Sequence, residues 1–234
     1  RFAEDKLFLV VNAGTTEKDW AWIKSHHSEH DDLGMRNASS EYCQIAVQGP
    51  DATGILQKLT ETDLGAIKYY HFTTGQVDGV DSIISRTGYT GEDGFEVYAS
   101  PEHAEHLWNK LLKTGEYGSE RGILPCGLAA RNTLRLEAAM SLYGHELGDD
   151  ISTLEAGLGW ITKLGKGDFT GSEKIAAQKE AGVTRKVVGF EMTEPGIGRD
   201  GMDIYVGDEK VGVVTSGSPA PFLKKNIGLA FLPP

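Results

Sequence analysis

Cysteine is scarce in this chain, which has only Cys43 and Cys126. Neither belongs to a Cys-x-x-Cys pair, the spacing typical of zinc and redox motifs. Such low and unpatterned usage argues against a disulfide framework and favours a reducing compartment. We therefore expect two free thiols, buried or half-buried, with Cys43 on a strand and Cys126 beside a turn.

Positive charge and long apolar runs are also lacking. Lys and Arg number 23 against 34 Asp and Glu, giving a formal net charge of −11, which argues against a nucleic acid held by phosphate neutralisation. No apolar run approaches the roughly 18 residues of a membrane span, and no signal-peptide pattern is visible. We expect neither nucleic acid nor membrane as a partner. With 39% hydrophobic residues, 234 residues suffice for a sizeable core in one or two domains.

The first part of the chain has the mixed patterns of an α+β fold. Residues 43–47 alternate as a strand, and residues 51–59 then follow a short helical pattern. A further helix is predicted over residues 100–115, with a serine N-cap, a proline in the first turn and a glycine at the end. The apolar run at residues 7–11 predicts a buried strand, and a helix opens soon after it.

The pattern changes from Val187 onward to short strands separated by glycine turns, among them residues 203–206. This change predicts an all-β unit at the C-terminal end. We place the junction at residues 178–182, which gives an α+β region at residues 1–180 and an all-β domain at residues 183–234.

The most informative segment is residues 85–98, where glycine and acidic turn residues lead directly into an alternating strand. Period two places Glu96 and Tyr98 on one face of this strand and Phe95 and Val97 on the other. A carboxylate is thereby fixed just beyond a constrained turn. Taken alone, the segment also fits an ordinary hairpin with a decorated turn.

Several further segments extend this signal along the chain. They are Val-Val-Asn-Ala at residues 10–13, Pro-Cys-Gly-Leu-Ala-Ala-Arg-Asn-Thr-Leu-Arg-Leu-Glu-Ala at 125–138, Leu-Tyr-Gly-His-Glu-Leu at 142–147, Glu-Ala-Gly-Leu-Gly-Trp at 155–160, Lys-Gly-Asp-Phe-Thr-Gly at 166–171 and Val-Gly-Val-Val-Thr-Ser-Gly at 211–217. In this order, over nearly the whole chain, they resemble the glycine cleavage system T protein family, the aminomethyltransferases that use tetrahydrofolate. The resemblance implies two interleaved subdomains in the first region, where folate binds, and a barrel-like C-terminal domain.

Glu96 is the residue that we expect to bind the pterin ring of tetrahydrofolate. A reduced pterin presents an amino group and an adjacent ring N–H, two parallel donors that one carboxylate accepts together. The resemblance implies this residue by position, since Glu96 is the second glutamate of Gly-Tyr-Thr-Gly-Glu-Asp-Gly-Phe-Glu at residues 88–96. Glu92, the first glutamate, is interpreted as a turn residue.

The resemblance also implies partners for the rest of the cofactor. Arg131 matches the family's arginine for the anionic glutamate tail, although a salt bridge on a helix surface would also explain it. Tyr89 and Trp160 are candidate aromatic walls, unless they belong to the core, and Asn12 is a candidate polar contact. Asn132 departs from the aspartate usual in the family, which puts a local charge pair in doubt.

The implied reaction transfers the methylene of an aminomethyl group on the lipoylated H protein to N5 of tetrahydrofolate, with release of ammonia. The family's catalytic aspartate lies upstream of where this chain begins, and we expect segments to be missing at both ends. No residue here is therefore assigned as catalytic. The family acts in the cytoplasm of bacteria and in the mitochondrial matrix of eukaryotes.

Two alternatives remain open from the sequence. One is a non-catalytic folate-binding module like the related iron–sulfur-assembly proteins, whose signature has cysteine where this chain has Asp168. The other is the folate domain of a dimethylglycine- or sarcosine-oxidising enzyme, normally fused to a flavin domain. The histidines at residues 26–30 and the pair His103 and His106 are interpreted as surface residues, so we assign no metal site.

Overall fold

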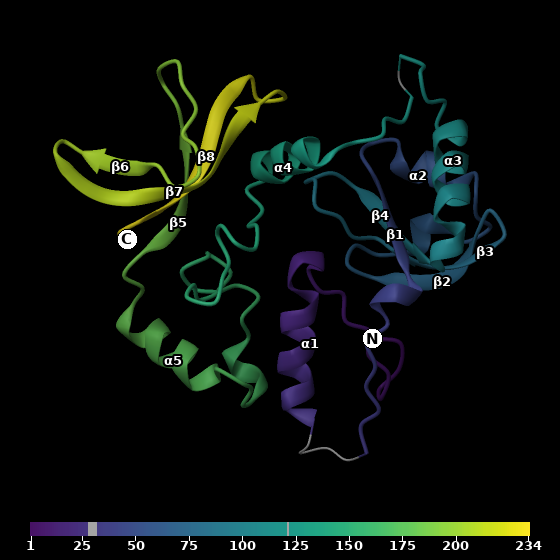
Figure 1. The fold of residues 1–234 in the computed structure, drawn as a ribbon, viewed down its shortest axis with the longest axis horizontal. Coiled ribbons are helices and arrows are strands. Elements are labelled where there is room, and N and C mark those ends of the chain that lie inside the picture. The colour runs from purple at the N-terminus through teal and green to yellow at the C-terminus, as the bar shows by residue number, and fades with distance from the viewer. Residues whose placement is uncertain (28–31, 121) are drawn as a thin grey trace.

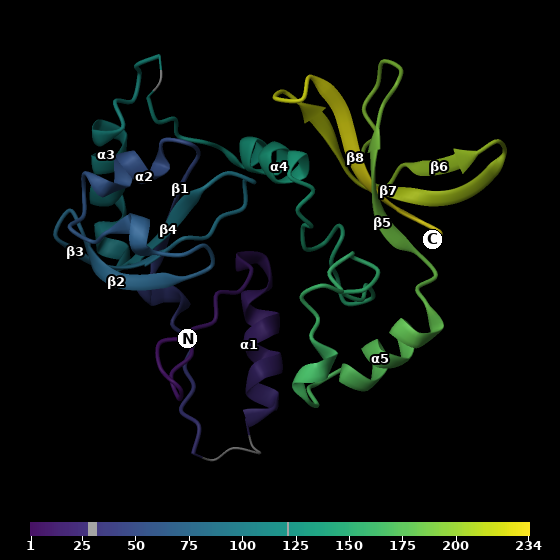
Figure 2. The same cartoon turned by 180° about the vertical axis from the view of Figure 1, so that it is seen from behind.

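The computed structural model describes residues 1–27, 32–120 and 122–234. Its strands form two four-stranded antiparallel sheets at opposite ends of the molecule, and helix α4 (Leu128–Glu137) lies between them (Figures 1 and 2). The α+β class and the C-terminal sheet domain that the sequence predicts are confirmed. No helix in the described residues is long and apolar enough to cross a membrane.

The first sheet has the strand order β1-β4-β3-β2. Its strands are β1 (Cys43–Gln48), β2 (Phe72–Val77), β3 (Val80–Ser85) and β4 (Gly94–Ala99). Helices α2 (Ala52–Gln57) and α3 (Ala104–Thr114) cover one face, because the inward residues of the strands alternate and meet apolar residues of both helices. The core residues include Ile84, Phe95, Val97, Leu56 and Leu107, all nearly inaccessible to solvent.

The opposite face of the first sheet carries Glu96 and Tyr98, as the alternation predicts. The antiparallel register sets Ser85 opposite Glu96 and Ile83 opposite Tyr98, so these side chains share that face. Part of it is covered by the N-terminal segment, where the ring of Phe8 lies edge-on to Tyr98 at 6.2 Å between centroids. The face is thus closed at Tyr98 and more open toward Glu96.

Residues 7–11 do not form the buried strand that their apolar run predicts. They follow a tight turn closed by a bridge between Ala3 and Lys6, and they have no strand assignment. Leu7 and Leu9 are 68% and 66% exposed. The prediction fails because a strand needs a hydrogen-bonded neighbour, and none of the described strands pairs with this segment.

Two further helices each precede one of the sheets in the chain. Helix α1 (Thr16–Ser25) follows the N-terminal segment, and helix α5 (Ser172–Ala181) precedes the second sheet. The predicted junction at residues 178–182 thus begins within the last turn of α5. Residues 28–31, with His30 of the histidine-rich stretch, lie outside the described residues. Among those described, no group of three or more metal-ligating side chains lies together.

The second sheet has the strand order β5-β8-β7-β6. Its strands are β5 (Lys186–Glu191), β6 (Asp203–Val206), β7 (Glu209–Ala220) and β8 (Lys225–Leu232). The turn between β6 and β7 has Gly207 at a φ of +62°, a conformation that glycine adopts without steric cost. Helix α4 packs against β7 and β8, which ties the second sheet to the region that contains Arg131.

Candidate functional site

The turn that leads into β4 is closed by a paired ionic contact. Arg86 donates from Nε to Oδ1 of Asp93 at 2.9 Å and from Nη2 to Oδ2 at 2.6 Å. Its Nη1 also donates to the carbonyl oxygen of Ile67 at 3.0 Å. The hydrogen bonds from Arg86 hold the pKa of Asp93 below its ordinary value. This bidentate contact fixes both ends of the segment between residues 86 and 93.

Glu96 lies immediately after this turn, with hydrogen-bond donors on both carboxylate oxygens. Gln44 donates to Oε1 at 2.6 Å, Thr87 donates to Oε2, and the Tyr98 hydroxyl donates to Oε2 at 3.4 Å. A carboxylate accepts about four hydrogen bonds, two per oxygen. Oε1 therefore keeps one position for another donor, and the long contact from Tyr98 is the weakest of the three. Burial, together with the charge of Glu96, raises the pKa of Tyr98.

Tyr89, in the middle of the same turn, contacts Arg131 of α4. The guanidinium carbon of Arg131 lies 4.4 Å from the centroid of the Tyr89 ring, and the Tyr89 hydroxyl donates to the carbonyl oxygen of Ser141 at 2.6 Å. Burial raises the pKa of Tyr89, against the opposing charges of Arg135 and Arg131. No carboxylate among the described residues lies within ion-pair distance of Arg131, so the expected alternative of a surface salt bridge is not observed there.

One turn therefore connects three of the five predicted residues. Thr87 contacts Glu96, and Tyr89, two residues later, contacts Arg131. The start of the turn thus contacts the carboxylate of Glu96, and an aromatic ring from its middle packs on the guanidinium of Arg131. A carboxylate and a guanidinium are the two polar groups that a ligand with a donor edge at one end and an anion at the other would need.

The structure does not bring Asn12 and Trp160 into contact with this group. Asn12 precedes α1, and its carbonyl oxygen accepts from the Thr15 backbone N–H at 3.1 Å. The Trp160 side chain is 67% exposed. Within the part of the chain that is described, no hydrogen bond or aromatic contact joins the side chain of either residue to Glu96, Tyr89 or Arg131. Both stay predictions.

Asn132 has a structural partner that the sequence did not reveal. Its Oδ1 accepts from Nε and Nη2 of Arg135 at 2.9 and 2.7 Å. A neutral amide therefore stands beside a buried guanidinium, and Asn132 makes no hydrogen bond with Arg131 among the described residues. The i, i+3 spacing on a helix was the only sequence signal for this contact.

Arg135, on the same helix as Arg131, forms a buried ion pair with Glu146. Their side chains are 1% and 0% exposed, with Nη1 of Arg135 at 3.1 Å from Oε2 of Glu146. Both also contact Ser216 of β7: Arg135 donates to its hydroxyl at 2.8 Å, and that hydroxyl donates to Glu146 at 2.6 Å. Sequence reasoning missed this pair, since Arg135 and Glu146 come from separate segments and their meeting depends on tertiary packing. The pair holds α4, and with it Arg131, against the second sheet.

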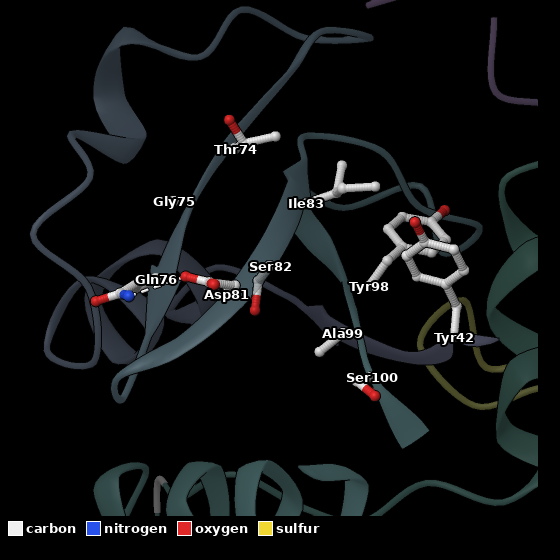
Figure 3. A pocket seen from close by; sticks show the side chains of 10 residues that line it. All are labelled: Tyr42, Thr74, Gly75, Gln76, Asp81, Ser82, Ile83, Tyr98, Ala99 and Ser100. Carbon is white, nitrogen blue, oxygen red and sulfur yellow. Dashed lines mark hydrogen bonds between the residues drawn. The ribbon is translucent and has the colours of Figure 1, made fainter. Parts of the chain in front are cut away.

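A cavity of about 400 Å³ opens on the first sheet beside Tyr98 (Figure 3). Tyr42 and Tyr98 stand at one end of it, and Gln76 and Asp81 stand at the other. Glu96 does not line this cavity. Tyr98 thus connects the cavity with Glu96, because it lines the cavity and its hydroxyl donates to the Glu96 carboxylate.

Two parts of the chain match the two domains of one known protein family. Residues 1–166 match the GCVT N-terminal domain, and residues 185–234 match the glycine cleavage T-protein C-terminal barrel domain. The chain belongs to the glycine cleavage T-protein family. The resemblance seen in the sequence motifs is thereby confirmed.

Individual members of the family are similar over the whole chain. A curated aminomethyltransferase of Desulfitobacterium hafniense (strain DCB-2) is 52% identical over 234 residues, covering 100% of this chain and 63% of the relative. One of Alkaliphilus metalliredigens is 50% identical, covering 99% and 62%. The crystal structure of glycine cleavage system aminomethyltransferase T from Bartonella henselae superposes with a TM-score of 0.81 at 28% identity, covering 95% of this chain and 59% of that one. The chain thus spans about 63% of the length of the curated relatives it matches.

Proposed function

We propose that this chain forms the folate-binding part of a glycine cleavage aminomethyltransferase. In this reaction, the methylene of an aminomethyl group carried on the lipoyl arm of H protein passes to N5 of tetrahydrofolate, and ammonia is released. The observation that carries the proposal is the single turn that joins Glu96, through Thr87 and Tyr89, to Arg131. The names of the curated relatives support the same reaction.

Glu96 receives the pterin in this proposal. Oε1 has one acceptor position left, and the 3.4 Å hydrogen bond from Tyr98 to Oε2 is readily exchanged for a ligand donor. The two parallel N–H groups of the pterin edge then replace Tyr98 and fill Oε1. Charge-assisted hydrogen bonds of this kind contribute about 1.5–3 kcal/mol each.

Arg131 receives the glutamate tail. Its guanidinium lies over the Tyr89 ring and has no carboxylate within ion-pair distance among the described residues, so it can pair with the carboxylates of the tail. Tyr89 then serves as the aromatic wall between the two ends of the ligand. Asn12 and Trp160 are proposed as outer contacts that approach when the cofactor is bound.

The proposal also assigns the setting of the reaction. The lipoylated H protein is the proposed partner, and tetrahydrofolate is the cosubstrate. Since the curated relatives named above are bacterial, we place the protein in a bacterial cytoplasm. The catalytic effect would arise from proximity and charge placement around an iminium-like intermediate.

Titration with tetrahydrofolate tests the site directly. Glu96→Gln should weaken binding about tenfold or more, since it replaces one charged acceptor by a donor that opposes the pterin N–H. Glu92→Gln is the matched control, because Glu92 is an exposed glutamate of the same turn. Equal affinity of wild type and Glu96→Gln would remove Glu96 from the site.

The proposed contact of Arg131 with the glutamate tail is tested by comparing ligands with and without that tail. Arg131→Ala should lower the preference for folate over pteroate, which lacks the glutamate, and the exposed Arg36→Ala should leave that preference unchanged. A mutant that prefers folate as strongly as wild type does would make Arg131 a structural residue.

Turnover separates the transferase from the alternatives. A chimera in which this chain replaces the matching part of the Desulfitobacterium hafniense relative supplies the remaining length. Methylenetetrahydrofolate formation from aminomethylated H protein is the expected activity. Activity on dimethylglycine or sarcosine instead, or folate binding without turnover, would favour the alternative enzyme or the non-catalytic module.

A further inference from the structure

The turn at residues 86–93 encloses a side chain from the end of β1. Nε2 of Gln48 donates to the carbonyl oxygens of Thr87 at 3.1 Å and Phe95 at 3.2 Å, while Oε1 accepts from the Thr90 hydroxyl at 3.1 Å. One amide therefore contacts the start and middle of the turn and the strand that follows it. The backbone just after β1 also contacts the turn, because the Gly49 N–H donates to the carbonyl oxygen of Asp93 at 2.9 Å.

Two glycines of the motif leave room for this amide. A Cβ at Gly88 would lie 1.7 Å from Oε1 of Gln48, and a Cβ at Gly94 would lie 2.7 Å from its Nε2. Both distances are far below van der Waals contact. The absence of a side chain at Gly88 is thus matched to the presence of Gln48. Gly94 also faces the backbone of β1, with the Val47 carbonyl oxygen 2.5 Å from its Cβ position, and Gly91, at a φ of +78°, is explained by its backbone conformation.

The position of this amide bears on both ends of the site. Thr87, whose carbonyl oxygen is held by Gln48, presents its hydroxyl to Glu96. Tyr89 lies between Thr87 and Thr90, the two turn residues that Gln48 contacts, and carries Arg131 on its ring. Loss of the amide would therefore release the segment that sets the spacing between the pterin acceptor and the tail cation.

We propose that Gln48 is a positioning residue of the folate site, which acts on the ligand through the turn rather than by touching it. The inference rests on the proposed function. It adds that the distance between the Glu96 and Arg131 subsites is set by one internal amide. Replacement of Gln48 should then weaken both halves of folate recognition together.

Gln57 provides a control of the same chemistry. Its Nε2 donates to the carbonyl oxygens of Thr60 and Thr62, both at 2.9 Å, and its Oε1 accepts from the Leu64 N–H at 3.0 Å. It too is a glutamine amide that closes a turn in the first domain region, but that turn makes no contact with Glu96 or Tyr89 among the described residues. A general loss of stability would affect both variants, and a loss of positioning would affect only one.

The test compares Gln48→Leu and Gln57→Leu by thermal unfolding and by titration with tetrahydrofolate and tetrahydropteroate. Both variants should lose stability, Gln48→Leu the more so because Gln48 is half-buried and Gln57 is exposed. Only Gln48→Leu should raise the dissociation constant for tetrahydrofolate, about tenfold, and lower the preference for the glutamate tail. In the chimera, its KM for tetrahydrofolate should rise while its KM for H protein stays unchanged.

A second pair of variants keeps the proposal falsifiable if Gln48→Leu does not fold. Gly88→Ala alone should weaken binding because its Cβ collides with Gln48, and Gln48→Ala should partly relieve that effect in the double variant. Unchanged affinity in Gln48→Leu, equal weakening by Gln57→Leu, or strict additivity of the Gly88 and Gln48 substitutions would overturn the inference. Wild-type protein that binds no tetrahydrofolate would refute the proposed function instead.

Discussion

The buried pair of Arg135 and Glu146 gives the sharpest stability prediction. All five N–H groups of Arg135 have acceptors: two on Asn132, one each on the Met140 carbonyl oxygen and Glu146, and one on Ser216. Glu146 is equally complete, with two donors on each oxygen. A fully paired buried network has no spare position, so any single change leaves a charge or a polar atom without a partner.

Glu146→Gln is the informative perturbation because it keeps the shape and removes the charge. If the new NH2 replaces Oε2, it faces two N–H donors, from Arg135 and Leu142. If it replaces Oε1, the Thr215 and Ser216 hydroxyls must turn to accept from it and lose their own acceptor. In either case Arg135 stays buried without a counter-charge. Breaking a buried pair in this way costs about 3–5 kcal/mol. The exposed pair of Glu191 and Lys225 is the control, where Glu191→Gln should cost at most about 1 kcal/mol.

Urea unfolding of both variants, followed by tryptophan fluorescence and by circular dichroism, measures these free energies. A cost below about 1 kcal/mol for Glu146→Gln would refute the reasoning, since that value is typical of a solvated pair. Arg135→Met and the double variant complete a cycle. Their coupling should reach about 0.5–3 kcal/mol because the two side chains share one network.

The same pair predicts a pH dependence. Burial by itself would raise the pKa of Glu146, but the hydrogen bonds from Ser216, Thr215 and the Leu142 N–H, with the charge of Arg135, outweigh it and hold the pKa below its ordinary value of 4.5. A carboxyl with a lowered folded pKa contributes stability that is complete above the unfolded value and is lost as the pH falls toward the folded value. Wild type should therefore lose stability below about pH 4.5 more steeply than Glu146→Gln.

Three further outcomes are expected. Gly91→Ala should destabilise the protein by about 1–2 kcal/mol from its left-handed backbone alone, with a further cost from the approach of its Cβ to within 2.6 Å of the Ala138 side chain, as urea unfolding would show. Asp93→Asn removes one charge from the bidentate contact with Arg86. It should lower the free energy of tetrahydrofolate binding by more than it lowers the free energy of unfolding, and the opposite result would contradict a role of this contact in the site. A thiol reagent should modify the exposed Cys126 faster than Cys43, which is half-buried on β1, and mass spectrometry of the native protein would reveal the opposite order if it held.

The local elements of this protein could be predicted from the sequence because each depends on neighbouring residues. The alternation around Glu96 placed it on the face of β4 opposite to that of Phe95. The apolar helical spacing located α3, although the predicted Ser-Pro start forms a 3-10 turn at Pro101–His103 and the α-helix begins at Ala104. The motifs in their order sufficed to identify the family. Such signals are contained in periods of two or 3.6 residues and in short turns, so no distant contact is needed to detect them.

The run at residues 7–11 shows where local signals stop. Apolar character predicted burial, but burial of a strand depends on a neighbour that the segment itself does not specify. The contact of Arg131 with Tyr89 and the position of Gln48 inside the turn likewise join residues about 40 apart in sequence. The pair of Arg135 and Glu146 needs Ser216 from the second sheet to complete its hydrogen bonds. Tertiary structure alone decides these contacts, because a charge or an amide is stable inside the protein only when groups from several segments arrive at once to pair with it.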